Sequence, residues 1–141
     1  MVNQSVRHGT GKPLPVWVRL VVILGALLFL VGAVVSKVNP TLLTNSPMTD
    51  AARVYADYTF ARDLAIAALL LLLLLVRARG ILAGVMVLVA LIQLLDILND
   101  LAHGALILIP GLLLFAVVFL LGAGQLFGRP LWQASTWQDA G

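Results

Sequence analysis

Four long stretches of apolar residues dominate this sequence and limit what it can fold into. They cover residues 16–36, 51–77, 80–102 and 105–127, the second one opening with several charged residues. An α-helix rises about 1.5 Å per residue, so about 20 apolar residues cross the roughly 30 Å hydrocarbon core of a bilayer. Because backbone polar groups find no water there, each stretch must be a helix. The sequence therefore predicts an all-α fold, an integral membrane four-helix bundle in one domain.

The composition excludes most classes of soluble protein. The chain is 62% hydrophobic and 11% charged, whereas about a quarter of the residues in a soluble domain are charged. It has no cysteine, which excludes disulfides, thiolate metal sites and a cysteine nucleophile. The net charge of +3 comes from arginines near the predicted membrane ends. It therefore indicates topology rather than nucleic-acid binding.

Lysine and arginine positions predict the orientation, because positive residues favour the cytoplasmic side. If both ends are cytoplasmic, the outer side holds Lys37, Arg53 and Arg62, and the inner side holds Arg7, Lys12, Arg19, Arg77, Arg79 and Arg129. We therefore expect a multi-pass protein of the cell (inner) membrane, with cytoplasmic tails over residues 1–15 and 128–141. A signal peptide is the competing interpretation of the first stretch, but no convincing small-residue cleavage site follows it.

The second stretch is unusual because only its later part is apolar. Leu64–Val76 supplies about 13 apolar residues, fewer than the roughly 20 that a span needs. Thr49 and Asp50 can cap a helix that starts earlier. This helix crosses the membrane only if its charged turns enter the bilayer or its headgroup zone. We therefore expect Arg62 and Asp63 to lie inside the membrane.

The third stretch carries a stripe of polar side chains near its end. The stripe consists of Gln93, Asp96, Asp100 and His103, with Asn99 beside it. Intervals of three and four residues place these side chains on one helical face. Ionisable groups inside a membrane are costly and usually face the protein interior with a partner. The stripe therefore indicates a polar site within the bundle.

Helix geometry brings the charged residues of the second and third stretches to the same depth. Counting from Arg79 at about 1.5 Å per residue, Asp96 lies roughly 25 Å along its span. Counting back from Arg77, Arg62 and Asp63 lie roughly 21–23 Å from the inner boundary. Because the two helices are antiparallel, these residues should meet inside the outer leaflet.

The common depth of these charged residues predicts an ion pair, and this pair has two interpretations. Arg62 and Asp96 can pair bidentately, and Asp63 then binds either Arg62, His103 or Lys37. In the first interpretation the pair is purely structural and fixes the register of two leucine-rich helices. In the second it belongs to a functional site, because more polar residues can converge here than one ion pair requires.

As a functional site, the cluster fits acid–base chemistry. The catalytic candidates are Asp96, which acts as acid or base, Arg62, which holds or polarises an oxygen atom, and Asp63. The ligand-binding candidates are Tyr58, Gln93, Asn99, Asp100 and His103. Adjacent turns of one helix give poor geometry for a metal site, and the spans hold no histidine pair for haem. We therefore expect no metal and no cofactor.

Two short patterns resemble the small four-span DoxX-like membrane families. They are an aspartate late in the third stretch followed by Asn99-Asp100 and His103-Gly104, and the segment Ala61-Arg62-Asp63-Leu64-Ala65. The resemblance covers roughly residues 16–127 and implies a four-helix membrane bundle. The DoxX name is associated with a quinone-reducing complex, but the broad family has no single established activity. The absence of cysteine argues against thiol-linked redox work here.

Three functions stay open at this point. The first is a membrane enzyme or binding protein that accepts an apolar small molecule from the outer leaflet, with isomerisation, cyclisation or epoxide opening as fitting reactions. The second is a non-catalytic accessory subunit that packs against a membrane-protein partner or forms a homo-oligomer through small-residue faces. The third, which we favour least, is a proton-linked transporter. The expected partners are the lipid bilayer and an apolar ligand, with no nucleic acid.

Overall fold

A computed structural model describes residues 13–41, 48–104, 106–128, 131 and 133 of the chain. Within that part, the long elements are four helices: α1 (Val16–Val38), α3 (Asp50–Val76), α4 (Arg79–His103) and α5 (Ile109–Phe127). All four are long and apolar enough to cross a membrane. The predicted all-α four-helix membrane bundle is confirmed.

Helix α3 includes the charged turns that precede its apolar part. The Thr49 side chain accepts a hydrogen bond from the backbone N–H of Ala52 at 3.2 Å, which satisfies one of the free donors of the first turn. The helix then continues without a break to Val76, and Arg77 ends it in the left-handed conformation (φ 58°). The charged turns are therefore part of one long helix, as the short apolar segment predicts.

The connection from α4 to α5 is longer than predicted. Gly104 ends α4 at φ 73°, a conformation that glycine adopts without steric cost. Helix α5 begins at Ile109 rather than near residue 105, with a proline at its start. Since proline has no N–H and its ring fixes φ, Pro110 suits the first turn of a helix and not its interior. It therefore explains the later start.

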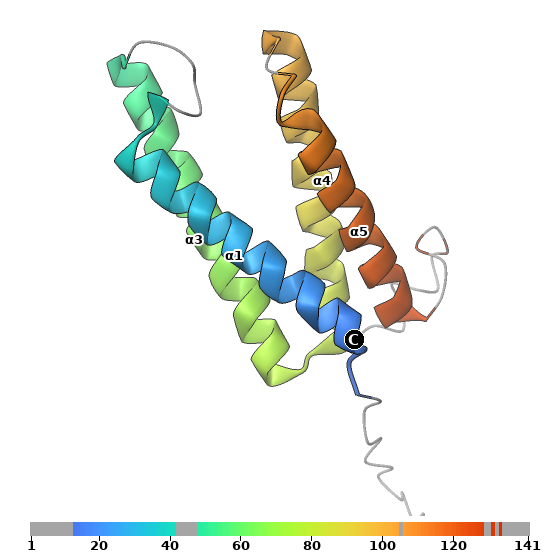
Figure 1. The fold of residues 1–141 in the computed structure, drawn as a ribbon. Coiled ribbons are helices and arrows are strands. Elements are labelled where there is room, and N and C mark those ends of the chain that lie inside the picture. Colours follow the sequence, from blue (N-terminus) through green and yellow to red (C-terminus); the bar gives the residue numbers. More distant parts are fainter. Residues whose placement is uncertain (1–12, 42–47, 105, 129–130, 132, 134–141) are drawn as a thin grey trace, which may run out of the picture.

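The four helices are arranged as two pairs. Helix α1 packs along α3, and α4 packs along α5, whereas contacts between the two pairs are far fewer. The pairs lie close together where α1 and α4 begin, and they diverge toward the end where α1 and α4 finish (Figure 1). We call these the converging end and the diverging end. By the predicted topology, the diverging end is the outer one.

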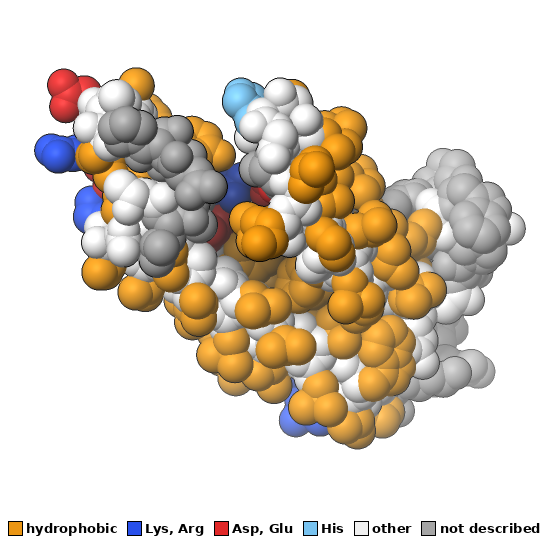
Figure 2. All heavy atoms as spheres, turned by 45° about the horizontal axis from the view of Figure 1, so that its top comes forward, with side chains coloured by type: hydrophobic (Ala, Val, Ile, Leu, Met, Phe, Trp, Pro, Cys, Tyr) orange, Lys and Arg blue, Asp and Glu red, His pale blue; other side chains and the backbone are white. Residues whose placement is uncertain are grey.

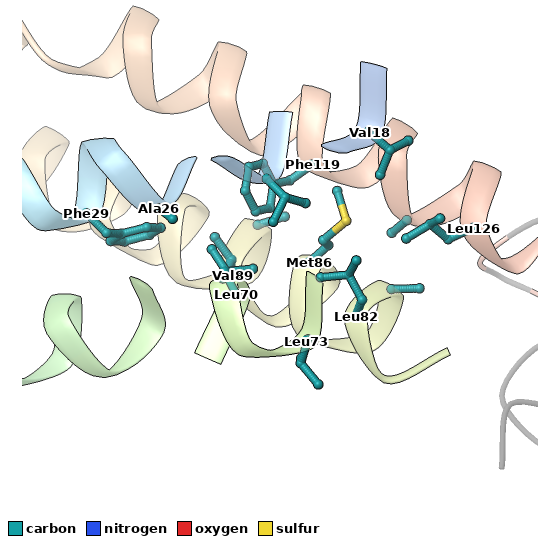
Figure 3. Packing of buried hydrophobic residues seen from close by; sticks show 14 of the residues in the cluster. Val18, Ala26, Phe29, Leu70, Leu73, Leu82, Met86, Val89, Phe119 and Leu126 are labelled. Carbon is teal, nitrogen blue, oxygen red and sulfur yellow. The ribbon is translucent and has the colours of Figure 1, made fainter. Parts of the chain in front are cut away.

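The apolar core joins the two pairs near the converging end. Each helix contributes fully buried side chains, among them Val18, Leu70, Met86 and Phe119 (Figure 3). Helices α4 and α5 come close at Gly122, where an added Cβ would lie 2.5 Å from Met86 Cε. This packing leaves the space between the pairs free only at the other end.

The outer surface of the helices is largely apolar. Leucine, valine and isoleucine side chains of all four helices are exposed, and hydrophobic atoms cover most of the described surface in Figure 2. Such a surface would aggregate in water, but it matches the hydrocarbon of a bilayer. The charged side chains between the helix pairs interrupt this apolar surface and therefore mark the candidate site.

Candidate functional site

A cavity of about 450 Å³ lies between the two helix pairs. This volume falls within the usual range of small-molecule sites, about 300–1,000 Å³. One wall is apolar and comes from Leu28–Val35 of α1 and Leu108–Phe115 of α5. The other wall is polar and comes from Arg62, Asp63, Gln93 and Asp96 of α3 and α4. Figure 2 looks toward the diverging end and shows basic and acidic side chains in the hollow between the pairs.

Arg62 of α3 is bonded to two carboxylates, one on its own helix and one on α4 of the other helix pair. Its Nε–H donates to Asp63 Oδ1 at 3.1 Å, and its Nη1–H donates to Asp96 Oδ1 at 3.2 Å. The predicted pairing of Arg62 with Asp96 is confirmed, and with it the prediction that α3 and α4 bring these residues to the same depth. The bidentate geometry is wrong, because the guanidinium divides its donors between two carboxylates.

Asp63 is held between α3 and α1. It is 6% exposed, and an added Cβ at Gly32 of α1 would lie 2.9 Å from its Oδ2. The carboxylate therefore occupies space that only a glycine leaves free. The Ser36 hydroxyl donates to the Gly32 carbonyl oxygen at 2.7 Å, which satisfies a buried hydroxyl on the same helix. Apart from the small size of the residue, the sequence contains no signal that places Gly32 at the site.

Two of the three partners proposed for Asp63 bind elsewhere. Lys37 donates to Asp57 at 2.7 Å, and both side chains are exposed. The His103 Nδ1 lies 2.8 Å from the Asn99 carbonyl oxygen of its own helix, the capping position that histidines often take at a helix end. Asp63 therefore binds Arg62, and the two alternatives are wrong.

Gln93 lies in the polar wall and is incompletely bonded. Its side chain lines the cavity and the residue is 6% exposed. Its Oε1 is buried and has no hydrogen-bond partner among the residues that the structure describes. A buried polar atom without a partner costs about 1–3 kcal/mol. Such an atom beside a cavity is a candidate contact for a ligand.

The other predicted ligand-binding residues lie outside the cavity lining. Tyr58 is 74% exposed, Asn99 and His103 are exposed, and Asp100 is partly buried one turn beyond Asp96. Their helical spacing does place them near the faces of Arg62 and Asp96. However, they belong to turns nearer the diverging end, where the opposite helix pair has moved away. The sequence pattern contains no signal for this divergence.

An aromatic cluster closes the cavity toward the core, and the sequence analysis did not identify it. The ring centroids of Phe29 and Phe115 are 6.2 Å apart in an edge-to-face arrangement, and those of Phe115 and Phe119 are 4.5 Å apart. An added Cβ at Gly25 would lie 2.6 Å from Phe119 and 2.8 Å from Phe115. Glycine at this position therefore admits the rings. Its small size was the only hint in the sequence.

The site combines one cation with two carboxylates. Arg62 has five N–H donors and the carboxylates are acceptors, so the group can hold and polarise oxygen atoms. The side chain of Asp96 is 30% exposed, against 8% for that of Asp63, so Asp96 is the more accessible of the two carboxylates. Among the described residues, no three His, Asp or Glu side chains come together as a metal site requires.

No family model matches the chain, and comparisons with curated proteins and with solved structures gave no significant match. The resemblance to the DoxX-like families therefore stays a proposal, based on Arg62, Asp63, Asp96 and His103. The first three of these residues meet at the cavity, and His103 does not.

Proposed function

We propose that the protein binds a lipophilic small molecule in the cavity between its helix pairs. The observation that supports this proposal is that the cavity has one apolar wall and one polar wall, which contains Arg62, Asp96 and Gln93. A purely structural ion pair would be packed shut, whereas the Arg62 side chain stays 38% exposed and that of Asp96 30%. The apolar part of the ligand would lie along α1 and α5, and its polar group would face α3 and α4.

The same arrangement supports acid–base chemistry on the ligand. The hydrogen bonds to Asp63 and Asp96 use two of the five N–H donors of Arg62. The remaining donors can polarise a ligand oxygen, and Asp96 can give or take a proton. Asp63 would then be a positioning residue that keeps the guanidinium in place. Isomerisation, cyclisation or epoxide opening are reactions that such a pair can promote.

The proposed setting is the cell (inner) membrane with both termini in the cytoplasm. It is supported by the larger number of arginine and lysine residues on the predicted inner side, six against three on the outer side. In this orientation the cavity lies in the outer leaflet, and the diverging helix pairs let a lipophilic ligand enter from the membrane. The same proposal includes membership of a DoxX-like family, which does not identify a substrate.

A non-catalytic accessory subunit is the second candidate. An added Cβ at Gly84 of α4 or Gly124 of α5 would meet no atom within 4 Å. Open positions of this kind let another membrane helix approach closely. A proton-linked transporter is the least favoured function, because the described core between the polar wall and the converging end is apolar. Purification as a lone monomer that carries a lipophilic ligand would favour binding over an accessory role.

A cavity-filling substitution tests the binding proposal. Gly111 lines the cavity, and an added Cβ there would meet no atom within 4 Å, so Gly111→Leu fills space without a clash. The matched control is Gly124→Leu on the same helix, at an equally open position that is not part of the cavity lining.

The reconstituted full chain would be photolabelled with two diazirine-bearing alkyl probes of equal length, one a fatty alcohol and one a fatty acid. We expect at least one probe to label the cavity-lining segments. Gly111→Leu should weaken that probe's binding about tenfold, which corresponds to about 1.4 kcal/mol, and Gly124→Leu should not. Labelling that is the same in both variants and the wild type would refute the proposal.

A further inference from the structure

The ionisable side chains that line the cavity include more acids than bases. Its ionisable lining residues are Arg62, Asp63 and Asp96, so two carboxylates face one guanidinium. The fourth polar lining residue, Gln93, is neutral. In surroundings of low dielectric constant, an uncompensated charge acts strongly on any ionic group that enters. A ligand with an anionic head group would therefore be repelled.

The described charges near the diverging end do not compensate this excess. Lys37 is bonded to Asp57, and the first turns of α3 carry one acid and one base, Asp50 and Arg53. Asp100 lies one helical turn beyond Asp96 and adds a further carboxylate. His103 turns its Nδ1 toward a carbonyl of its own helix. The approach to the cavity is therefore acidic as well.

The hydrogen-bonding capacity of the polar wall further restricts which head groups fit the cavity. Asp96 can only accept, Arg62 can only donate, and the Gln93 amide can do both. A ligand carboxylate would bring acceptors against Asp96. An ammonium group would balance the formal charge, but it has only donors, so it cannot accept a hydrogen bond from Arg62 and would face the positive guanidinium. A hydroxyl group can donate to Asp96 and accept from Arg62 at once. It alone among these head groups complements the polar wall without adding charge.

We infer that the ligand of this cavity is a neutral lipid whose head carries a hydroxyl group. The inference rests on the proposed function, because it specifies the ligand class for the same cavity. The lining segments of α1 and α5 each extend over seven residue steps, Leu28–Val35 and Leu108–Phe115, or about 10 Å of helix. The apolar tail lies along these segments, and the hydroxyl group lies beside the Arg62–Asp96 pair, where it can contact both side chains.

The test compares head groups on the intact protein in bilayers. Three photoreactive alkyl probes of equal chain length carry a hydroxyl, a carboxylate or an ammonium group, and affinities are expressed per mole fraction of probe in the bilayer. At a pH of about 9 the carboxylate and the ammonium are both charged. We expect the alcohol to bind the wild-type protein at least about tenfold more tightly than either ion, a difference of about 1.4 kcal/mol.

A charge-removing variant provides a second measurement. Asp96→Asn makes the formal charges of the cavity balance, so the alcohol should lose most of its advantage over the carboxylate. The matched control, Asp57→Asn, removes a carboxylate from the exposed pair with Lys37 and should leave the preference unchanged. If Asp96→Asn does not fold, the comparison of the three probes on the wild-type protein tests the inference by itself.

The outcomes separate the two proposals. A carboxylate or ammonium probe that labels the cavity as tightly as the alcohol overturns the inference and leaves the binding function standing. Labelling outside the cavity by all three probes, with no effect of Gly111→Leu, overturns the binding function and the inference together. A preference for the alcohol that persists fully in Asp96→Asn overturns the charge argument.

Discussion

Replacing Gly32 by alanine tests the contact that holds the charged site together. The new methyl group would lie 2.9 Å from Asp63 Oδ2, closer than side-chain carbons normally approach an oxygen. Asp63 is buried and its other oxygen is bonded to Arg62. Relief therefore requires either that α1 and α3 separate or that the hydrogen bond to Arg62 breaks.

The expected magnitude is the difference of two terms. Overpacking of a well-packed interior costs about 1–3 kcal/mol, and replacing a helical glycine by alanine returns about 0.5–1 kcal/mol. We expect Gly32→Ala to lower the free energy of unfolding by about 1.3 kcal/mol, the midpoint of a difference that spans about 0–2.5 kcal/mol. Gly84→Ala is the matched control, since nothing lies within 4 Å of its added Cβ. It should be neutral or stabilising by up to about 1 kcal/mol.

The assay is reversible unfolding of the purified protein in mixed micelles with increasing denaturing detergent, followed by circular dichroism. A double-mutant cycle isolates the contact, because Asp63→Ala removes the oxygen that the new methyl group meets. In that background, Gly32→Ala should lose its penalty, with a coupling of about 1–2 kcal/mol. Equal stability of Gly32→Ala and Gly84→Ala would refute the reasoning. So would an unchanged penalty in the Asp63→Ala background.

The remaining predictions concern the ion pairs and the topology. Arg62→Ala leaves Asp63 buried without a partner, so it should lower the free energy of unfolding by about 2 kcal/mol or more in the same assay. Lys37→Ala breaks an exposed pair and should lower it by less than about 1 kcal/mol. Equal losses of stability in the two variants would contradict the difference in burial. Because the chain has no cysteine, single substitutions report topology directly. A membrane-impermeant thiol reagent applied to intact cells should label Asp50→Cys and not Arg77→Cys, and the reverse pattern would overturn the proposed orientation.

The depth of the charged residues was predictable because few quantities determine it. The rise per residue of a helix is fixed, and the apolar length of a span is set by the bilayer. The shortage of apolar residues in the second stretch therefore placed Arg62 and Asp63 in the membrane. Counting along the antiparallel third helix then brought Asp96 level with them, and the hydrogen bond at 3.2 Å agrees.

The direction in which each polar side chain faces was less predictable. In a bilayer, lipid tails are as apolar as leucine, so hydrophobic patterning does not mark the packed face of a helix. The pairing of α1 with α3 and of α4 with α5 depends on close fits such as Gly32 against Asp63 and Gly122 against Met86. The contact of Gly25 with Phe119 joins the two pairs within the core, and Tyr58, nearer the diverging end, is exposed and outside the cavity lining.

The two carboxylates bonded to Arg62 differ in their surroundings. Asp63 is enclosed against Gly32 and bonded to Arg62, so it fixes the guanidinium and has little access to a ligand. Asp96 comes from the other helix pair, remains partly exposed and lines the cavity. A pair that only fixes the register of α3 and α4 requires Arg62 and Asp96, and it would require neither an exposed Asp96 nor the additional carboxylate of Asp63 on the same helix as Arg62. Arg62 and Asp63 on α3 thus supply a cation that is held by its neighbouring carboxylate. Asp96 on α4 supplies a more exposed carboxylate on the other side of the gap between the helix pairs.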